Sequence, residues 1–372
     1  MSSAETDRRY MTGALALARR GLGNVWPNPA VGCVIVRDGR VVGRGWTQPG
    51  GRPHAETEAL ARAGAAAKGA TAYVTLEPCS HHGQTGPCAE ALVKAGIARV
   101  VVALADPDPR VAGQGLAMLR AVGIPVETGL LSNEARAINR GFFSRVEAGR
   151  PMVTLKLALS LDGKIAAHTG DSRWITGDAA RGAAHGLRAS HDAVAVGIGT
   201  AAFDDPMLDC RLPGVAVRQP VRIVFDSRLQ LPLTARIIAT AKQCPTWIVT
   251  LRDTAENLVE ARADALRELG VELVEADAGA TGRLSIGSAL KALGERGLTR
   301  LLVEGGGRLA AGFLDENYVD ALTIFRGPQI IGGDGVPGIA PLGLDKVADA
   351  RRFRLIDRRA AGEDVVETYL PA

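Results

Sequence analysis

Apolar residues in the first part of the chain recur at two different spacings, which predict alternating helices and strands. Between residues 7 and 23 they recur at helical spacing, and Gly21 and Gly23 supply the stop. Two Val-rich runs then flank the turn "RDGR" within residues 30–46, as in a β-hairpin. Helices are expected at residues 54–69, 88–96 and 113–123, and strands at residues 70–77, 98–104 and 125–129. This alternation is typical of a three-layer α/β domain.

The alternation continues beyond residues 145–151, where "RVEAGRP" combines charge, Gly and Pro. Such segments often link domains, and a chain of 372 residues is long for one domain. We therefore expect one domain over residues 1–147 and a second over residues 148–372. Strands of the second domain are expected at residues 152–160, 193–200, 221–227, 245–250, 271–277, 300–306 and 320–327. Its helices are expected at residues 178–191, 255–270, 285–297 and 308–317.

Composition and charge narrow the classes of function. Hydrophobic residues make up 47% of the chain and its mean hydropathy is +0.08, values that describe a soluble protein with ample core material. Lys and Arg number 44 against 40 Asp and Glu, aromatic residues are only 4%, and we find no basic stripe. Nucleic-acid binding is therefore not expected. The start "MSSAETDRRY" has no signal-peptide core and no run reaches membrane-spanning length, so we expect a cytoplasmic protein without a membrane partner.

Residues 75–92, "TLEPCSHHGQTGPCAEAL", contain the first candidate chemistry. Cys79, His81, His82 and Cys88 could form a disulfide loop, a closed structural zinc site or part of an open catalytic one. Five cysteines, an odd number, in a chain without a secretion signal argue against a disulfide framework. On local spacing alone, a closed zinc site and a catalytic one are equally good explanations.

The upstream segment "PHAETEAL" favours the catalytic explanation. His54-x-Glu56, followed by Pro78-Cys79 at a strand end, matches the H-x-E…P-C pattern of zinc nucleobase deaminases. Such a site needs three protein ligands, which His54, Cys79 and Cys88 supply, and a fourth position for water. Zinc lowers the pKa of that water, and Glu56 acts as general base and then general acid. Because His54 and Glu56 are two residues apart, both must lie in the first turn of the helix.

One feature of the cluster differs from this pattern, because eight residues rather than two separate the cysteines. His81 and His82 lie inside that insertion, and we expect them not to bind the metal. They would line the mouth of the substrate site or simply cap the loop. Cys88 follows Pro87 at the start of the next expected helix, where the helix dipole favours the thiolate.

The second half has no G-x-G-x-x-G after its first strand, but two glycine-rich segments follow apolar runs. Residues 305–307, "GGG", lie between an expected strand and helix, where backbone amides could hold a phosphate. Residues 197–200 end another such run. Each segment alone is typical of a tight turn, whereas together they favour a dinucleotide site. Lys156 stands mid-strand, where a lysine without a partner would be costly, so we expect it to be functional and to pair with Glu304.

Eight segments carry a specific resemblance when they are taken together. They are "NPAVGCVIV", "HAETEAL", "TLEPCSHHGQTGPC", "DPDPRVAGQG", "LKLALSLDGKIA", "DSRWITG", "GIGTAAFDDPMLDCR" and "VEGGGRLAAGFL". The chain closely resembles the bifunctional riboflavin-biosynthesis deaminase–reductase family over nearly its whole length. In that family the longer loop between the cysteines is normal, and Gly86 stands where a second proline is usual. The resemblance implies a cytidine-deaminase-like three-layer α/β domain followed by a dihydrofolate-reductase-like α/β domain.

The resemblance also implies two reactions and two cofactors. The first reaction is the hydrolytic, zinc-dependent deamination of 2,5-diamino-6-(5-phosphoribosylamino)pyrimidin-4-one. In the second, NADPH reduces the ribosyl side chain of 5-amino-6-(5-phosphoribosylamino)uracil to a ribityl chain. Members of the family form dimers or tetramers through the reductase half, so a homo-oligomer acting on a small molecule is expected.

Site residues follow from the same resemblance. Those that would contact the dinucleotide are Ala158, Trp174, Thr200, Asp204, Ser227, Gly305, Gly306 and Gly307. Those that would contact the pyrimidine substrates are Asn28 in the first half and Lys156, Ser172, Arg188, Leu208, Arg211 and Glu304 in the second. The arginines suit a ribose phosphate, because guanidinium groups bind phosphates in bidentate fashion. From the residues alone, Asn28 could merely shape a turn, Arg188 could be a surface charge and Trp174 could belong to the core.

Two other functions are compatible with a zinc cluster. One is a tRNA-editing-type zinc deaminase with an accessory domain. The low aromatic content, the lack of a basic stripe and the glycine-rich second half argue against it. The other is a zinc-stabilised binding protein, in which the metal only ties loops together and replacement of Glu56 would change no activity.

Overall fold

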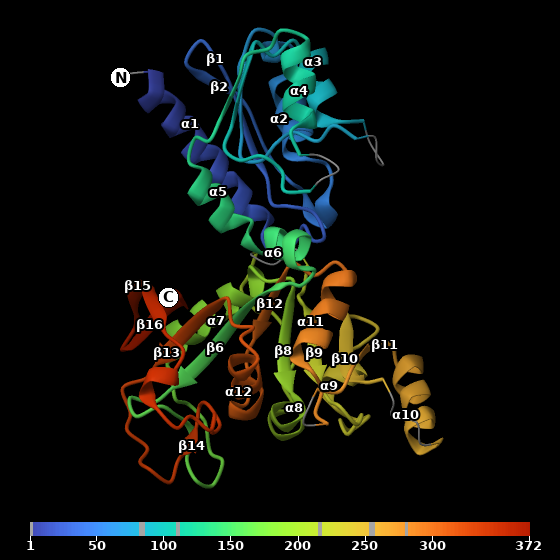
Figure 1. Ribbon diagram of the computed structural model, residues 1–372, viewed down its shortest axis with the longest axis vertical. Coiled ribbons are helices and arrows are strands. Elements are labelled where there is room, and N and C mark those ends of the chain that lie inside the picture. The colour runs from blue at the N-terminus through green and yellow to red at the C-terminus, as the bar shows by residue number, and fades with distance from the viewer. Residues whose placement is uncertain (1–2, 82–85, 109–111, 215–217, 253–256, 280–281) are drawn as a thin grey trace. The chain divides into compact units, whose positions relative to one another are not determined.

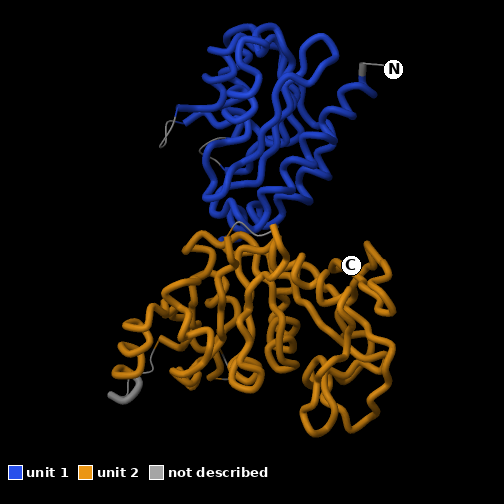
Figure 2. Tube along the Cα trace, turned by 180° about the vertical axis from the view of Figure 1, so that it is seen from behind, with its two compact units in different colours: residues 1–149 blue, residues 150–372 orange. Residues whose placement is uncertain are grey.

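The computed structural model describes the chain except for residues 1–2, 82–85, 109–111, 215–217, 253–256 and 280–281 (Figure 1). It divides into two compact units, Met1–Gly149 and Arg150–Ala372 (Figure 2). The division falls after residue 149, whereas the sequence pattern places it after residue 147. Each unit has hydrophobic clusters of its own.

Within the described residues, unit 1 contains a five-stranded sheet in the order β2-β1-β3-β4-β5. Its strands are β1 (Gly32–Arg37), β2 (Arg40–Trp46), β3 (Thr71–Val74), β4 (Arg99–Val102) and β5 (Val126–Thr128). β1 runs antiparallel to β2 and β3, while β3, β4 and β5 run parallel. The helices are α1 (Ser3–Ala18), α2 (Ala55–Ala63), α3 (Cys88–Lys94), α4 (Gln114–Ala121), α5 (Ser132–Ile138) and α6 (Arg140–Ala148).

Hydrophobic side chains are buried on both faces of this sheet, which makes unit 1 a three-layer α/β domain, as predicted. Residues of α2, α3 and α4 cover one face, where they pack with Cys33 and Ile35 of β1. Residues of α1 and α5 cover the other face, where Val34 and Val36 are buried (Figure 1). β1 is therefore apolar at successive positions because helices cover both of its sides.

Some boundaries in unit 1 differ from those expected. The helix predicted over residues 54–69 ends at Ala63 and continues as a 3-10 turn, Gly64–Ala67. Gly64 ends it because its φ of 53° lies outside the helical region. The sequence pattern gives no indication of α5 and α6, which lie in a segment rich in charged residues. Phe142 and Phe143 of α6 nevertheless pack into the same cluster as α2, α3 and α4.

Glycines of the hairpin allow helices to lie unusually close to the sheet. A Cβ atom at Gly32 would lie 1.9 Å from the carbonyl oxygen of Ala14 in α1. Cβ atoms at Gly43 and Gly45 would lie 2.2 Å and 2.1 Å from carbonyl oxygens of α2. Since these are backbone atoms of regular helices, no larger residue fits without moving the helix.

We expect Gly32→Ala to destabilise the protein by about 1–3 kcal/mol, because the added methyl group pushes α1 away from β1. Gly13→Ala is the matched control at the same interface, since a Cβ atom there would lie 4.0 Å from Val34. That variant should be neutral or stabilising by up to about 1 kcal/mol, as expected for glycine replaced within a helix. Denaturant unfolding of both variants measures the difference, and equal stabilities would contradict the close packing.

The described part of unit 2 contains a nine-stranded sheet in the order β11-β10-β9-β8-β12-β6-β13-β16-β15. Its strands are β6 (Met152–Leu159), β8 (Ala193–Gly197), β9 (Val221–Phe225), β10 (Thr246–Leu251), β11 (Val271–Ala276), β12 (Arg300–Val303), β13 (Ala321–Arg326), β15 (Phe353–Ala361) and β16 (Asp364–Pro371). Neighbours from β11 to β13 in this order are parallel, and β16 and β15 add on antiparallel. The central part is thus the α/β sheet that the alternation predicts.

Helices and a small two-stranded sheet surround these strands. The helices are α7 (Asp178–Ala189), α8 (Ile198–Asp204), α9 (Arg236–Ala239), α10 (Asn257–Glu268), α11 (Ile286–Glu295) and α12 (Gly307–Asp315). The small sheet pairs β7 (Lys164–Ala166) with β14 (Val336–Pro337). In the part of the chain that the structure describes, no helix combines the length and hydropathy needed to cross a membrane.

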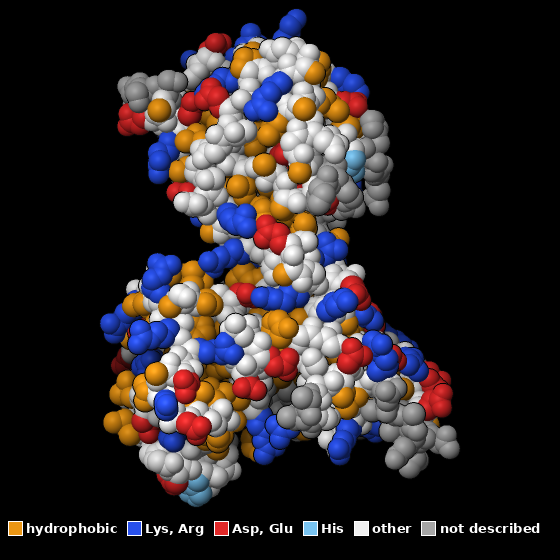
Figure 3. Space-filling view, in the orientation of Figure 1, with side chains coloured by type: hydrophobic (Ala, Val, Ile, Leu, Met, Phe, Trp, Pro, Cys, Tyr) orange, Lys and Arg blue, Asp and Glu red, His pale blue; other side chains and the backbone are white. Residues whose placement is uncertain are grey.

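Three features of unit 2 differ from the sequence-based expectation. The strand expected over residues 193–200 ends at Gly197, where α8 begins, and the strand expected over residues 300–306 ends at Val303. The hairpin of β15 and β16 is not indicated by the pattern, because β15 is exposed along most of its length and shows no alternation. Hydrophobic and basic side chains gather over this hairpin (Figure 3).

The ends of β8 and β12 place glycines and a carboxylate at one edge of the sheet. Gly197 is the last residue of β8, and Glu304 and the glycines after it follow β12, so all of them lie at the carboxyl ends of parallel strands. Open α/β sheets bind their ligands at that edge. Glu304 and residues 305–307 are therefore at the edge where a ligand is expected.

Candidate active sites

The candidate site of unit 1 is built where β3 ends and two helices begin. His54 precedes α2 in an extended conformation, with φ −71° and ψ 161°, and Glu56 is the second residue of that helix. Both therefore lie at the first turn, as their spacing predicts. Cys79 follows β3, and Cys88 is the first residue of α3, directly after Pro87.

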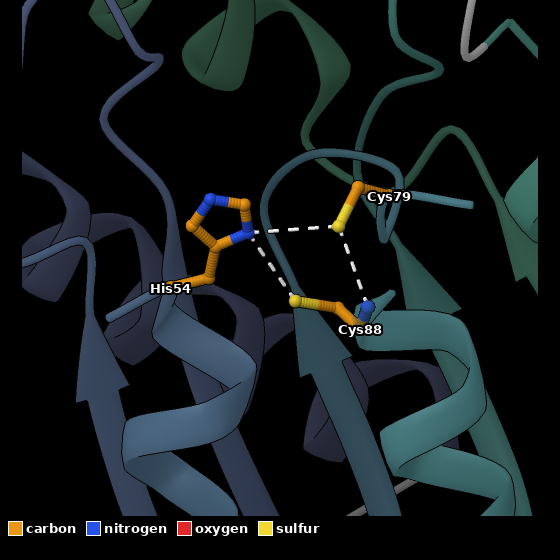
Figure 4. Close-up of side chains that lie close together, drawn as sticks. All are labelled: His54, Cys79 and Cys88. Carbon is orange, nitrogen blue, oxygen red and sulfur yellow. Dashed lines mark hydrogen bonds between the residues drawn. The ribbon is translucent and has the colours of Figure 1, made fainter. Parts of the chain in front are cut away.

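The side chains of His54, Cys79 and Cys88 point toward one another (Figure 4). Nδ1 of His54 lies 3.3 Å from Sγ of Cys88 and 3.6 Å from Sγ of Cys79. All three ligand atoms lie within 4.8 Å of one another. The five cysteines of the sequence are all described and all free, so the disulfide explanation is wrong.

This group fits a zinc ion in its chemistry and in its spacing. With Zn–S of about 2.3 Å and Zn–N of about 2.0–2.1 Å, neighbouring ligands of a tetrahedral site lie about 3.6 Å apart. The two sulfur–nitrogen distances agree with that value. His81 is exposed and does not belong to the group, so a closed site completed by His81 is wrong. His82 lies outside the described residues.

Burial and hydrogen bonding change the pKa values of the ionisable groups in this site. The Cys88 thiol and His54 hydrogen-bond to the sulfur of Cys79, and the pKa of Cys79 falls to about 4 in spite of its burial. The pKa of Cys88 is raised, because it is the donating partner of Cys79 and is itself buried. Burial raises the pKa of Glu56 to about 7, although His54 opposes this shift. A divalent cation bound between the two sulfurs would favour ionisation of both thiols.

Glu77, between β3 and Cys79, holds a second loop against the cluster. Its buried carboxylate accepts hydrogen bonds from backbone N–H groups at distances of 3.0 to 3.3 Å. The donors are Asp106, Gly113, Gly115 and Leu116. Burial also raises the pKa of Asp106 in this loop to about 6. Sequence reasoning missed Glu77, whose signal is a carboxylate that directly follows a buried strand and precedes Pro78-Cys79.

Asn28 lies in the loop between α1 and β1. Its amide donates a hydrogen bond of 3.1 Å to the carbonyl oxygen of Gly51, in the segment just before His54. A Cβ atom at Gly51 would overlap the Asn28 amide, so glycine is required there. Asn28 thus joins two loops, which agrees with its turn-shaping role, and its contact with substrate stays a prediction.

The candidate site of unit 2 has Glu304, directly after β12, at its centre. Arg188 of α7 forms a bidentate pair with it, at 2.6 Å from Nε to Oε1 and 2.9 Å from Nη2 to Oε2. Lys156 of β6 lies 3.9 Å from the same carboxylate, which confirms the expected pairing. The Arg188 side chain is only 15% exposed, so the explanation as an ordinary surface charge is wrong.

Each charge of this group depends on the other two. Burial and the Arg188 charge lower the pKa of Lys156, and Glu304 opposes them. Burial would raise the pKa of Glu304, but Arg188 and Lys156 outweigh it and keep that pKa below its ordinary value. Burial opposes the charge of Arg188, yet Glu304 outweighs it and raises the pKa of Arg188. One carboxylate thus compensates two cations, and the remaining positive charge suits an anionic ligand.

Arg211 and Leu208 lie on the segment that Arg188 contacts. The Arg188 guanidinium donates to the carbonyl oxygen of Asp209 at 2.8 Å. The backbone N–H of Arg211 donates to Nδ1 of His185 at 3.3 Å, and its guanidinium lies 3.3 Å from Nε2. Leu208 is buried beside them. His185 was not indicated by any motif, and its signal is the spacing of three residues from Arg188 on one helix face.

The glycine loop after β12 fits the phosphates of a dinucleotide. A Cβ atom at Gly305 would lie 3.1 Å from Thr200 of α8, and Gly306 has a φ of 73°. A Cβ atom at Gly307, the first residue of α12, would lie 2.8 Å from the carbonyl oxygen of Pro337. Bare backbone at the start of a nine-residue helix suits a phosphate, because amide N–H groups and the helix dipole both favour an anion.

Trp174 and its neighbours lie on the surface. Trp174 is 65% exposed, so the explanation as a core residue is wrong, and the Arg181 guanidinium lies 4.3 Å from the centre of its ring. Ser172 lies in the same loop. Burial raises the pKa of Asp204, the last residue of α8, and the charge of Arg173 opposes this shift. Contact of Trp174, Ser172 and Asp204 with a ligand stays a prediction.

Two further predicted dinucleotide residues lie on other strands. Ala158 packs near Phe325, on the same face of β6 as Lys156. Ser227 follows β9, and its carbonyl oxygen accepts a bond from Leu251 of β10. β9 is two places from β12 in the sheet, so Ser227 is not brought into the Glu304 group.

Comparison with known families identifies both halves. A model described as "RibD C-terminal domain" matches residues 151–367, and one described as "Cytidine and deoxycytidylate deaminase zinc-binding region" matches residues 4–104. The chain belongs to the RibD family. Riboflavin biosynthesis protein RibD of Bacillus amyloliquefaciens is 43% identical over 366 residues, which cover 98% of this chain and 96% of that protein. RibD of Escherichia coli (strain K12) is 41% identical over 371 residues, covering 96% and 98%.

Solved structures of the RibD family agree with this assignment. RibD of Acinetobacter baumannii, form 2, superposes with a TM-score of 0.89 at 37% identity, with all of both chains covered. A diaminohydroxyphosphoribosylaminopyrimidine deaminase/5-amino-6-(5-phosphoribosylamino)uracil reductase from Thermotoga maritima superposes with a TM-score of 0.86 at 34% identity, again over all of both chains.

Membership of the RibD family confirms the two fold classes, a cytidine-deaminase-like domain followed by a dihydrofolate-reductase-like domain. The chain is an enzyme of riboflavin biosynthesis with a zinc-dependent deaminase part and an NADPH-dependent reductase part. Its zinc-type group, His54, Cys79 and Cys88, lies inside the matched zinc-binding region. The tRNA-editing-type deaminase and the zinc-stabilised binding protein are thereby set aside.

We expect the purified protein to contain zinc, and Cys79→Ala to lose it, because two remaining ligands cannot hold the ion firmly. Cys244→Ala is the matched control, since Cys244 is a free cysteine in unit 2. Elemental analysis after dialysis measures both variants. Full zinc content in Cys79→Ala would contradict the ligand set.

Proposed function

We propose that unit 1 deaminates 2,5-diamino-6-(5-phosphoribosylamino)pyrimidin-4-one and that unit 2 reduces the ribosyl side chain of 5-amino-6-(5-phosphoribosylamino)uracil. The Thermotoga maritima relative is named for these two activities. The observation that carries the proposal is the meeting of His54, Cys79 and Cys88 beside the buried carboxyl of Glu56. Residues 1–147 would form the deaminase domain and residues 148–372 the reductase domain.

In the deamination, His54, Cys79 and Cys88 hold the metal. Bound zinc supplies a nucleophile at neutral pH, because it lowers the pKa of a coordinated water. Glu56 would take one proton from the attacking water and give it to the ring nitrogen. It would then carry the second proton of that water, from the new hydroxyl group on the ring carbon, to the amino group, which leaves as ammonia while the carbonyl forms. A carboxyl group with a pKa of about 7 suits both the uptake and the return of the proton. Asn28 holds the pyrimidine.

In the reduction, unit 2 mainly binds and orients. NADPH, when bound, supplies the hydride, and the chain excludes water and places the two reactants. Backbone amides of residues 305–307 hold the phosphates of the dinucleotide next to Thr200. Other parts of the dinucleotide are contacted by Ala158, Trp174, Asp204 and Ser227.

The phosphoribosyl part of the substrate binds at the Glu304 group. Arg211, which is exposed, and Arg188, which Glu304 orients, pair with the phosphate. The buried ammonium of Lys156 supplies the proton that the ribose ring oxygen takes up as the ring opens at C1′. Ser172 and Leu208 complete the walls of this part of the site.

We further propose that the enzyme acts in the cytoplasm on small molecules and assembles with copies of itself through unit 2. β15 is an edge strand of the sheet and exposes the apolar side chains of Leu355 and Ile356. An open sheet edge with apolar side chains is a surface suited to pairing with another chain.

We expect Glu56→Gln to lower kcat of the deamination by about 10²–10⁴-fold, because glutamine keeps the shape of the side chain but cannot carry the proton. Zinc content should be unchanged, and so should reduction of the preformed deaminated intermediate. Ammonia release, metal analysis and NADPH consumption on the purified full chain measure the three quantities.

An unaffected deaminase in this variant would reject the role of Glu56 and would fit a metal that only ties loops together. Ammonia release from tRNA, but not from the pyrimidine phosphate, would instead indicate an RNA-editing deaminase. Both substrates are therefore offered to the wild-type protein in the same assay.

In unit 2, we expect Arg188→Lys to raise KM of the reduction by about tenfold, because an ammonium cannot reproduce the bidentate pairs of a guanidinium. Arg296→Lys is the control, since Arg296 pairs with Glu272 at an exposed position remote from Glu304 in the sheet. Steady-state NADPH consumption measures KM in both variants, and ammonia release should be normal in both. An unchanged KM in Arg188→Lys would remove Arg188 from the substrate site.

A further inference from the structure

Asn139, between α5 and α6, forms a buried double hydrogen bond with a distant loop. The backbone N–H of Ala30 donates to Oδ1 of Asn139 at 2.8 Å, and Nδ2 of Asn139 donates to the carbonyl oxygen of Ala30 at 2.9 Å. The Asn139 side chain is 3% exposed, so water does not compete for these bonds. The amide thus pairs with the loop much as the backbone of a neighbouring strand would.

The backbone of Asn139 is already satisfied by the two helices. Its N–H donates to the carbonyl oxygen of Ala135, and its own carbonyl oxygen accepts from the N–H of Phe143. Its side chain makes no capping hydrogen bond to α6. Both polar atoms of the side chain are therefore used for Ala30 and not for the helices.

Ala30 belongs to the same loop as Asn28. The Asn28 amide reaches Gly51 on one side of this loop, at 3.1 Å. On the other side, the N–H of Val31 donates to Oγ1 of Thr47 at 3.0 Å, where β1 is about to begin. Asn139 holds the residue between these two contacts, so a shift of Ala30 would be passed to Asn28 through two peptide units.

We propose that Asn139 is a positioning residue of the deaminase, which fixes Ala30 and thereby places the Asn28 side chain for the pyrimidine. This inference rests on the proposed contact between Asn28 and the substrate. An amide is suited to the task because it offers one donor and one acceptor, which match the carbonyl oxygen and N–H of a single residue. Aspartate would keep only the acceptor, and alanine would keep neither.

The test is the kinetics of the full chain with Asn139→Ala. We expect KM of the deamination to rise by about tenfold, the effect of losing hydrogen bonds that place a binding group. kcat should change much less, zinc content should be unchanged, and reduction of the preformed intermediate should be normal. Asn139→Asp, which keeps the bond from the Ala30 N–H, should give an intermediate KM.

Tyr73→Phe is the matched control in the same hydrophobic cluster. Tyr73 and Ala30 both belong to the cluster beneath α1, and the Tyr73 hydroxyl donates to Asp7 in a buried hydrogen bond. This variant therefore loses a buried hydrogen bond of the same core without touching the Asn28 loop. Its deaminase KM should equal that of the wild type.

A double-mutant cycle with Asn28→Ala separates the two proposals. If Asn139 acts through Asn28, Asn139→Ala should add little to the KM of Asn28→Ala. A normal KM in Asn28→Ala would reject the proposed substrate contact, and the inference with it. A raised KM in Asn28→Ala with a normal KM in Asn139→Ala would reject the positioning role alone. Loss of zinc from Asn139→Ala would show that Asn139 has a purely structural role. The same conclusion would follow if kcat fell equally in Asn139→Ala and in Tyr73→Phe.

Discussion

The candidate site of unit 1 depends on the close approach of three side chains after the end of β3, the sulfurs of Cys79 and Cys88 and the imidazole nitrogen of His54. The sulfurs of Cys79 and Cys88 share a proton when no cation is present, because burial and mutual proximity disfavour two thiolates. A divalent cation held by His54, Cys79 and Cys88 would reverse that balance and would join three segments of the chain at once. Burial also raises the pKa of Glu56, the proposed proton carrier, in the same environment.

Backbone geometry around the cluster is maintained by side-chain amides and carboxylates. Glu77 accepts from backbone N–H groups of the segment that follows β4, and Asn139 pairs with both the N–H and the carbonyl oxygen of Ala30 in the loop before β1. Each of these side chains is buried and fully engaged, which limits how far its loop can move. Asn28, the proposed substrate contact, lies in one of these loops, and buried hydrogen bonds of this kind keep such a residue in place.

In unit 2 the candidate site is organised by a buried group of charged side chains. Its central carboxylate, Glu304, neutralises part of the charge of Arg188 and Lys156 and stays ionised because of them. Removing any one member would leave a buried charge without compensation, so the three depend on one another. The glycine loop that follows Glu304 leaves bare backbone at the start of α12, next to this charged group. An anionic cofactor and an anionic substrate can thus be bound from one strand end.

The alternation of helices and strands in the central part of each unit, the zinc-type motif and the glycine loop could be predicted from the sequence, because periodicity and ligand spacing are local properties of the chain. His54 with Glu56 at a helix start and Cys88 at the next are examples. The pairing of β15 with β16 and the roles of Glu77, His185 and Asn139 could not be predicted. β15 is exposed along most of its length and shows no alternation that would mark a strand. Glu77, His185 and Asn139 contact segments far from them in sequence, so no local pattern encodes their partners. Only the tertiary structure brings those segments to hydrogen-bonding distance, where burial makes the loss of each hydrogen bond costly.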